Sequence, residues 1–315
     1  MTSDLRATSY ELRANYKILS KQSLGTDVKR LDIKAEEIAR RIQPGQFVMV
    51  MPHERSEKIP LSVVDADPVR GSISLIFQEI GFTTKQLGAV QINDTIFNIL
   101  GPLGVPLAME KLGNVVCITT GAGATQILPI CRAHKKIGNK VIGILGAKTK
   151  KNLMLEAQLR LTCHKILIAT DDGSYIKRGL ATDLLREVLK QEKINLVYAV
   201  GSVDMMEAVC AMTRERSIPS RVSLHPLILD GTGMCGSCRV KVAGETVLAC
   251  VEGPEFDGHA VDFADLKVRM NAFVVKQDSE GKELEWYSQQ SPLNRPRSES
   301  GIFQRLRSVF QKNRP

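Results

Sequence analysis

The sequence predicts a β barrel plus α/β fold class. An N-terminal antiparallel barrel or sandwich is followed by a doubly wound parallel sheet and then by a small cysteine-bearing C-terminal subdomain. Three observations predict it. Short β-branched runs separated by turn signals fill residues 8–99. Apolar strands alternate with helical stretches from Gly113 to Leu224. Beyond Pro226, three of the chain's seven cysteines stand close together.

The composition is that of a packed globular protein. At 315 residues the chain has room for roughly two domains, and 43% apolar content is ordinary for such proteins. The start, MTSDLRATSYELRANYKILS, lacks the apolar run of a signal peptide, and no stretch approaches the ~18 apolar residues of a membrane span. We therefore expect a cytoplasmic protein with no transmembrane segment. There, an odd number of cysteines favours metal or redox chemistry over a disulfide framework.

The net charge of +9 is the one feature that suggests nucleic-acid binding. Its distribution argues against that interpretation, because residues 289–315 hold six basic residues against one acid. The rest of the chain is only mildly basic, as solvated surfaces usually are. We expect no nucleic-acid partner, and a zinc-bearing nucleic-acid-binding protein remains the alternative from a different functional class.

The first segment is expected to be a small antiparallel domain. Its apolar runs are QFVMVM, LSVVDA, SISLIFQEI and DTIFNIL, and turn signals such as PG, DADPVRG and IND separate them. This spacing is typical of a barrel or a sandwich.

The second segment alternates strands with helices. Strands are expected at NVVCITTG, KVIGILGA, KILIATDDG and LVYAVGS, each followed by a helical stretch. The pattern predicts a parallel doubly wound sheet, in which ligands bind at the carboxyl ends of the strands. Asp171 and Asp172 stand at one such end, either as binding groups or as solvated loop acids.

The turn TTGAGATQILPI carries the phosphate-binding candidates Gly121, Ala122, Gly123 and Ala124. Glycines between a strand and a helix let backbone N–H groups approach a pyrophosphate, whose charge the helix N-terminus favours. A tight strand-to-helix turn also needs glycine for steric reasons, so the motif alone supports both interpretations.

The cysteines of the third segment have the spacing of a four-ligand site with one ligand missing. Cys235 and Cys238 are followed after eleven residues by Cys250, and Asp230 is the nearest candidate for the fourth ligand. Zinc accepts three thiolates and an oxygen, whereas C-x4-C-x2-C with a distant fourth cysteine is a [2Fe-2S] spacing. The spacing favours the cluster and leaves zinc open. Four further cysteines are expected to be small buried hydrophobes: Cys117, Cys131, Cys163 and Cys210.

The stretches ATDDGSYIKRGLATDLL, SLHPLILDGTGMCGSCRV and CVEGPEFDGHAVDF carry a family resemblance. From about residue 10 to 273 the chain resembles the ferredoxin reductase-like electron-transfer subunits, most closely the small subunit of NADH-dependent ferredoxin:NADP oxidoreductase, also known as sulfide dehydrogenase. The resemblance implies three parts: an FAD-binding β barrel at 8–108, an NAD(P)-binding α/β domain at 109–225, and a [2Fe-2S] cluster-binding subdomain at 226–273. It also implies the four cluster ligands, which are Asp230, Cys235, Cys238 and Cys250. Residues 274–315 lie outside the resemblance and are expected to be a linker with a basic amphipathic tail.

The resemblance implies two flavin-binding elements. In KIPLSVV, Pro60, Leu61 and Ser62 correspond to a strand that lies against the flavin; the family's arginine and aromatic residue are both absent, and Lys58 is the nearest replacement for the charge. In IGFTTKQL, the FAD pyrophosphate would meet backbone and hydroxyl groups, although an ordinary hairpin turn is the alternative. The residues concerned are Gly81, Thr83 and Thr84.

The nicotinamide dinucleotide is expected where the glycine turn meets Asp172 and Gly201, the latter at the position where family members often carry Cys-Gly-Pro. Lys148, Lys150 and Lys151 follow the second strand of this domain and are either a 2′-phosphate site or an exposed loop. The resemblance favours NAD(H), while the sequence leaves NADP(H) open.

The function implied is electron transfer between NAD(H), FAD and a [2Fe-2S] cluster within a complex that holds a large flavin/[4Fe-4S] subunit. Hydride chemistry belongs to the cofactors, so no side chain is assigned as a catalytic acid, base or nucleophile. The electron-transfer subunit of dihydroorotate dehydrogenase is the alternative within this class. The tail sequence IFQRLRSVF has apolar residues at helical spacing, and we expect it to dock onto the partner subunit.

Overall fold

The structure is a computed structural model that describes residues 16–25 and 27–271. The chain divides into two compact units, Met1–Lys267 and Val268–Pro315. The contacts and sites discussed below all belong to the first unit. Among the residues described, no helix combines the length and apolar character needed to cross a membrane.

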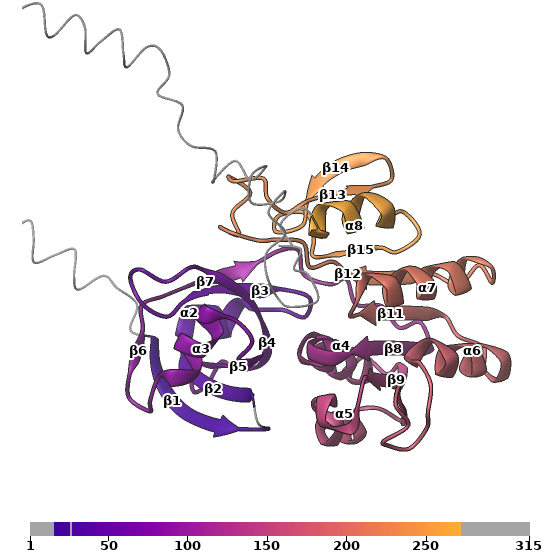
Figure 1. Cartoon of the computed structure of the whole chain (residues 1–315), viewed down its shortest axis with the longest axis horizontal. Coiled ribbons are helices and arrows are strands. Elements are labelled where there is room, and N and C mark those ends of the chain that lie inside the picture. Colours follow the sequence, from indigo (N-terminus) through magenta and orange to yellow (C-terminus); the bar gives the residue numbers. More distant parts are fainter. Residues whose placement is uncertain (1–15, 26, 272–315) are drawn as a thin grey trace, which may run out of the picture. The chain divides into compact units, whose positions relative to one another are not determined.

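The first segment forms a seven-stranded antiparallel sheet in the order β6-β1-β2-β5-β4-β3-β7 (Figure 1). The two outermost strands of this order are consecutive in the chain, so the sheet curls around one apolar core, as the barrel prediction requires. Its strands are β1 (Tyr16–Ser23), β2 (Val28–Lys34), β3 (Phe47–Met51), β4 (Ile59–Asp67), β5 (Ser72–Gln78), β6 (Thr95–Ile96) and β7 (Asn98–Leu103). Its helices are α2 (Glu36–Arg41) and α3 (Phe82–Ala89).

Strand β3 is apolar along its whole length because both of its faces are buried. Successive side chains of a strand point to opposite faces. Val48 and Val50 belong to the barrel core, whereas Phe47 and Met49 belong to a second core shared with the C-terminal part of the described chain. The run FVMVM therefore packs the barrel against the parallel sheet and the cysteine-bearing segment.

The second segment forms the predicted parallel sheet, in the order β10-β9-β8-β11-β12-β15. All pairs are parallel except the last, in which β15 runs antiparallel to β12. The strands are β8 (Asn114–Thr120), β9 (Lys140–Ala147), β10 (Lys165–Thr170), β11 (Leu196–Val200), β12 (Ser220–Ser223) and β15 (Glu255–Asp257). Strand β15 follows the cysteines in the chain, so the third segment supplies the last strand of the parallel sheet.

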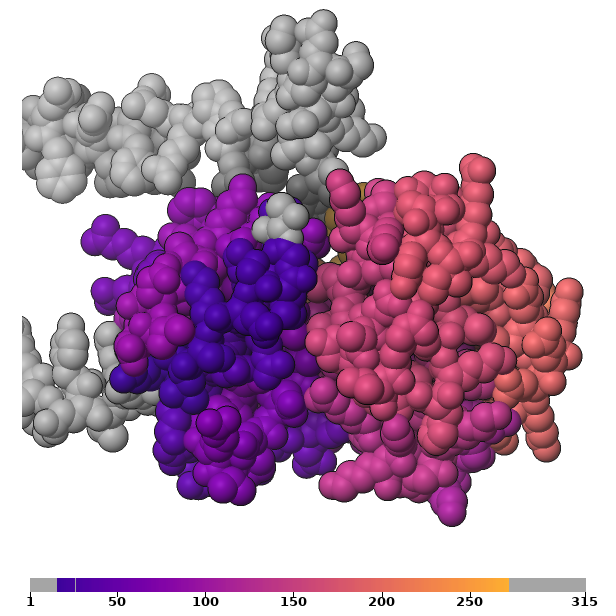
Figure 2. Space-filling view, turned by 90° about the horizontal axis from the view of Figure 1, so that it is seen from below, coloured from indigo at the N-terminus to yellow at the C-terminus, as the bar shows by residue number. Residues whose placement is uncertain are grey.

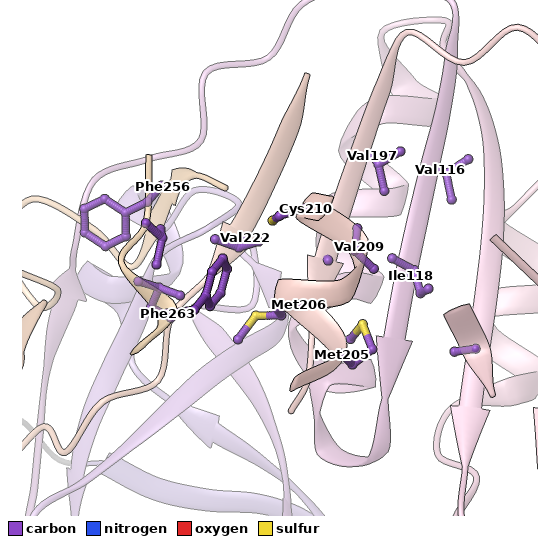
Figure 3. Close-up of a cluster of buried hydrophobic side chains, with 14 of the residues drawn as sticks. Val116, Ile118, Val197, Met205, Met206, Val209, Cys210, Val222, Phe256 and Phe263 are labelled. Carbon is purple, nitrogen blue, oxygen red and sulfur yellow. The ribbon is translucent and has the colours of Figure 1, made fainter. Parts of the chain in front are cut away.

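Helices cover both faces of this sheet, as alternation along β8 shows. Val115 and Cys117 face the core beneath α4 (Ala124–Lys136) and α5 (Glu156–Thr162). Val116 and Ile118 face the opposite core, beneath α6 (Ala181–Gln191) and α7 (Val203–Arg214). The buried side chains of this second core extend from β8 and β11 through α7 to Phe256 and Phe263 (Figure 3).

The third segment contributes the hairpin β13 (Arg239–Val242) and β14 (Glu245–Leu248) and the helix α8 (Phe263–Asn271). Cys238, Val240 and Cys250 lie in the same core as Met49 of β3. The cysteine loop is thus not a separate module, because its apolar side chains are buried only against the barrel and the parallel sheet.

The barrel also lies directly against the parallel-sheet domain, as Figure 2 shows for one face. On α4, Arg132 donates to the carbonyl oxygen of Val64 over 3.3 Å and pairs with Asp65 at 3.5 Å. Val64 and Ile76 of the barrel belong to the core beneath α4. The junction between the two domains is therefore apolar at its centre and polar at its edge.

Truncating the shared core should destabilise the protein more than truncating the surface. Ile118 is fully buried (0% exposed), so Ile118→Ala should lower the free energy of unfolding by about 2 to 5 kcal/mol through lost burial and a residual cavity. Val69 is 97% exposed, and Val69→Ala should change it by no more than about 0.5 kcal/mol. Urea unfolding followed by circular dichroism measures both. Equal effects would contradict the assignment of this core.

Candidate functional site

A cavity of about 660 Å³ opens at the carboxyl ends of β8, β9, β10 and β11. This is the edge at which open α/β sheets bind ligands. Its walls come from the loops after these strands and from the first turns of α6 and α7. The lining residues are Thr120, Gly121, Gly146, Ala147, Lys148, Asn152, Asp171, Leu180, Ala181, Thr182, Ser202, Asp204, Met205 and Ala208.

The two glycines of the TTGAGA turn have different roles. The turn is a short 3-10 segment, Gly121–Gly123, that leads directly into α4. Gly121 has φ +55 and open space where a Cβ would stand, so its backbone is accessible from the cavity. A Cβ on Gly123 would lie 2.7 Å from the carbonyl oxygen of Val200. The steric interpretation of the motif therefore holds at Gly123, whereas Gly121 leaves its backbone open to the cavity.

The carboxylate of Asp172 accepts hydrogen bonds within its own turn. Its Oδ1 accepts hydrogen bonds from the backbone N–H and the hydroxyl of Ser174, at 2.9 and 2.6 Å. These bonds hold the pKa of Asp172 below its ordinary value. The cavity is lined instead by the preceding residue, Asp171.

Gly201 shapes the cavity from behind. A Cβ there would collide with the hydroxyl of Thr120 and with Met205, so the glycine lets the loop after β11 lie close to β8. The next residue, Ser202, lines the cavity and caps α7 by accepting a hydrogen bond from the N–H of Met205 at 3.3 Å. Of the three candidate lysines, Lys148 lines the cavity, whereas Lys150 lies 4.8 Å from the ring centre of Tyr175.

Sequence reasoning missed the wall formed by the start of α6. Leu180, Ala181 and Thr182 line the cavity, and Asp183 caps the helix by accepting a hydrogen bond from the N–H of Leu180 at 3.0 Å. The signal was present, since an aspartate three residues into a helical run is an N-terminal mark.

The first flavin-binding candidates lie on β4 beside β3, with Pro60 opposite Met49, Leu61 opposite Val48 and Ser62 opposite Phe47. Ser62 also lines a smaller cavity of about 340 Å³ between β4 and α4.

The second candidate flavin-binding element is a helix start and not a hairpin turn. Gly81 precedes α3, its N–H donates to the hydroxyl of Thr84 at 2.9 Å, and that hydroxyl donates back to the carbonyl of Gly81 at 3.0 Å. Thr83 is buried at 4% exposed. A helix N-terminus favours anions through its unpaired N–H groups and its dipole.

In the cysteine loop, Asp230 already accepts several hydrogen bonds. Its Oδ2 accepts from the N–H of Cys235 at 2.7 Å, and its Oδ1 accepts from the hydroxyl of Thr232 at 2.7 Å and from the N–H of the same residue. Hydrogen bonds from the side chain of Cys235 and then from the hydroxyl of Thr232, followed by the backbone N–H groups of both residues, hold the pKa of the Asp230 carboxyl well below its usual range. The carboxylate is thus kept ionised and oriented by its own loop.

The other two candidate ligands form a buried pair. Cys238 and Cys250 have their sulfur atoms 3.2 Å apart, and burial raises the pKa of Cys250 to about 12. Cys235 is exposed, with its sulfur 3.1 Å from the hydroxyl of Ser237.

Within the described part of the chain, no three His, Cys, Asp or Glu side chains converge tightly enough to hold a single metal ion. The candidate ligands instead lie in two pairs. The N–H of Cys235 donates to Asp230, and the sulfur atoms of Cys238 and Cys250 are in contact.

The remaining cysteines are buried, as the sequence predicted. Cys117, Cys131 and Cys163 lie in the core beneath α4 and α5, and Cys210 lies in the core beneath α7.

Comparison with known proteins agrees with this geometry. Residues 225–262 match the family described as the iron-sulfur cluster binding domain of dihydroorotate dehydrogenase B. The chain is 38% identical over 253 residues to a Thermotoga maritima protein named as a homolog of the dihydroorotate dehydrogenase B (NAD(+)) electron transfer subunit, covering 80% of this chain and 89% of that one. It is 36% identical to an uncharacterized protein of Clostridium beijerinckii, over 86% of this chain and 94% of the relative.

Solved structures of related electron-transfer proteins also superpose on this chain. A chain of the NADH-dependent reduced ferredoxin-NADP oxidoreductase superposes with a TM-score of 0.78 at 36% identity, covering 82% of this chain and 94% of that one. A cytochrome P450 reductase of Amycolatopsis superposes with a TM-score of 0.55 at 18% identity, over 64% of this chain and 66% of that one, which shows the shared fold alone.

Filling the large cavity should weaken binding of a nicotinamide dinucleotide. Ala208 lines the cavity from α7, so Ala208→Phe should raise the dissociation constant for NADH by at least about tenfold, or ~1.4 kcal/mol. Ala211→Phe is the matched control, because Ala211 lies on the same helix and is exposed. Titration calorimetry of both variants measures the effect, and unaltered affinity in Ala208→Phe would place the dinucleotide elsewhere.

Proposed function

The chain belongs to the ferredoxin reductase-like electron-transfer subunits, the family that includes the dihydroorotate dehydrogenase B electron transfer subunits, and we propose that it transfers electrons between NAD(H), FAD and a [2Fe-2S] cluster within a larger oxidoreductase. The observation that carries this proposal is the shared core in which barrel strand β3, the parallel sheet and the cysteine loop are packed together. A continuous core fixes the three cofactor-bearing parts relative to one another, which electron transfer requires.

When bound, NADH supplies hydride transfer to a flavin, and a [2Fe-2S] cluster supplies one-electron transfer. The residues of the chain bind and orient these groups. For the dinucleotide, the accessible backbone at Gly121 and the start of α4 receive the pyrophosphate, and Gly146 and Ala181 form the floor of the cavity, where a Cβ on Gly146 would lie 2.8 Å from that of Ala181. Gly123 and Gly201 support the turn by close packing.

For the flavin, β4 and the start of α3 supply the binding groups. Ser62 is the hydrogen-bonding residue of the strand, beside Pro60 and Leu61. Because no arginine stands on this strand, the negative charge of the pyrophosphate is met chiefly by the N-terminus of α3 at Thr83, while Gly81 holds the start of the helix through its hydrogen bond to Thr84.

For the cluster, Asp230 and Cys235 form one ligand pair and Cys238 and Cys250 the other. The carboxylate needs no proton loss to bind, whereas burial opposes ionisation of the Cys250 thiol until a metal takes the place of its proton. The hydrogen bond from the N–H of Cys235 to Asp230 keeps the two residues together, which supports a mixed set of carboxylate and thiolate ligands.

We propose NADH as the nucleotide. Lys148 is one cation in the cavity, but Asp171 and Asp204 line the same cavity and would oppose the extra charge of a 2′-phosphate. The relatives' names, which mention NAD(+) and NADH, are consistent with this choice.

The relatives are subunits of complexes, so this chain is itself a subunit. The partner we propose is a large flavin/[4Fe-4S] subunit of a ferredoxin:NAD(P) oxidoreductase, in the cytoplasm, with a dihydroorotate dehydrogenase partner as the second candidate. An exposed loop end beside Cys235, with Met234 90% and Val251 44% exposed, supports a contact near the cluster. The tail expected to dock onto the partner, residues 301–315, lies outside the described residues.

The cluster ligands can be tested one at a time. Asp230→Cys should keep a [2Fe-2S] centre with an altered reduction potential, because a thiolate replaces a harder carboxylate. Cys235→Ser and Cys250→Ser should lose it. Iron analysis and electron paramagnetic resonance measure both, with Cys210→Ser as a control at a buried cysteine away from the loop. If Asp230→Ala left the iron content and the resonance spectrum unchanged, aspartate would not be a ligand.

The isolated subunit should oxidise NADH with an artificial electron acceptor, because its barrel and its nucleotide cavity are both complete within the described chain. Stopped-flow mixing with NADH should bleach the flavin absorbance directly. If neither NADH nor NADPH lowered the flavin absorbance, the proposed function would be wrong.

A further inference from the structure

A buried carboxyl group stands where the three parts of the molecule meet. Glu255 begins β15 and lies opposite Ser223 of β12. A Cβ on Gly45, in the loop before β3, would lie 3.3 Å from Cγ of Glu255. From α4, Gln126 donates through Nε2 to Oε1 of Glu255 at 2.9 Å and also to the hydroxyl of Ser223. The Glu255 side chain, on the last strand of the sheet, thus lies beside the barrel loop and is hydrogen-bonded to α4.

Two oxygen atoms at this junction are buried without a hydrogen-bond partner among the described residues: Oε2 of Glu255 and Oε1 of Gln126. Glu255 is only half-buried as a residue, yet this carboxyl oxygen is out of contact with solvent. Buried polar atoms normally have partners, and leaving one unpaired costs free energy. A carboxylate here would leave both atoms unpaired and would bury a negative charge.

A single proton on Oε2 of Glu255 would give both unpaired oxygen atoms a hydrogen-bond partner. A protonated Oε2 is a donor and the amide oxygen of Gln126 is an acceptor, so the two side chains can join through a pair of opposed hydrogen bonds, O–H to Oε1 of Gln126 and N–H to Oε1 of Glu255. The donor of one bond and the acceptor of the other belong to the same planar group on each side. No such pair is available to an ionised carboxylate, which only accepts.

We propose that Glu255 is a positioning residue, held as a neutral carboxylic acid in a two-hydrogen-bond pair with Gln126, and that this pair fixes the nucleotide-binding turn against the cluster-bearing segment. Gln126 lies in the first turn of α4, three residues after Gly123. Loss of the proton breaks one bond of the pair and charges the junction, which loosens the turn at Gly121 that lines the nucleotide cavity. The effect on NADH rests on the proposed function, whereas the protonation state does not.

The electrostatic surroundings agree with this state. Burial raises the pKa of the Glu255 carboxyl to about 8, and only the hydrogen bond from Gln126 opposes the shift. The groups facing it are uncharged: Gln126 from α4, Ser223 from β12 and Gly45 from the barrel loop. The cation further along α4, Arg132, pairs with Asp65 of the barrel.

The sign of the linkage follows from this shift. The unfolded chain releases the proton above about pH 4.3, whereas the folded protein keeps it up to about pH 8. Glu255 therefore stabilises the fold less and less as the pH rises through this window, by about tenfold in the unfolding equilibrium constant per pH unit, and has a constant effect above it. Glu255→Gln, which is neutral at all pH values and can form the same pair, should remove this slope.

The test uses the full-length holoprotein as wild type, Glu255→Gln and the control Glu245→Gln, which alters an exposed glutamate of β14. Infrared difference spectroscopy should show the C=O stretch of a protonated carboxylic acid at neutral pH. It should vanish with a midpoint near pH 8 in wild type and the control, and be absent from Glu255→Gln. Stopped-flow flavin reduction over a range of NADH concentrations should show the apparent dissociation constant rising several-fold across the same midpoint in wild type, with no such rise in Glu255→Gln.

A wild-type protein without this band at neutral pH would overturn the neutral acid, and that measurement needs no variant to fold. If the band titrates but wild type and Glu255→Gln share one pH dependence of NADH binding, the positioning role is wrong. A protein that NADH does not reduce at any pH would overturn the proposed function and the positioning role together, while the infrared titration would still decide the protonation state.

Discussion

The packing of the cysteine loop onto barrel strand β3 is the contact on which the arrangement of the molecule depends. Gly231 has φ +82, and a Cβ there would lie 2.6 Å from Cγ of Met49. The loop can approach the strand only because this residue has no side chain. Cys238 and Cys250 then enter the same core as Met49, so these two candidate ligands are fixed by burial against the barrel, whereas Cys235 stays exposed.

Periodicity predicted the two sheets because their signal is local. Alternation along β8, with Val115 and Cys117 on one face and Val116 and Ile118 on the other, can be read without knowing the fold. Strand β15 could not be predicted in this way, because three residues carry no period and its pairing with β12 is set by tertiary contacts. The domain boundaries proposed at 225 and 273 remain predictions, although the sheet itself crosses the first of them.

The candidate site was predicted where the chemistry is carried by one stretch of sequence. Gly121 and the Asp230 loop are of this kind. The cavity wall was predicted less well, since Leu180, Ser202 and Ala208 come from three loops or helices that meet only after folding. Asp172 illustrates the limit within a single turn, because its side chain turns back to Ser174 while its neighbour Asp171 lines the cavity.

Asp230 and Glu255 show how hydrogen-bond donors and burial together determine the charge state of a carboxyl group. Asp230 lies in a glycine-rich loop that brings both the side chains and the N–H groups of Cys235 and Thr232 toward its carboxylate, and these donors keep it ionised. Glu255 lies in a strand whose backbone groups are committed to β12, so a single side-chain amide is its donor and burial dominates. Ionisation suits a ligand for a cationic centre, and neutrality suits an apolar junction between domains. The same physical rule thus gives opposite charge states to two carboxyl groups of one segment, according to how many hydrogen-bond donors the local structure brings to each of them.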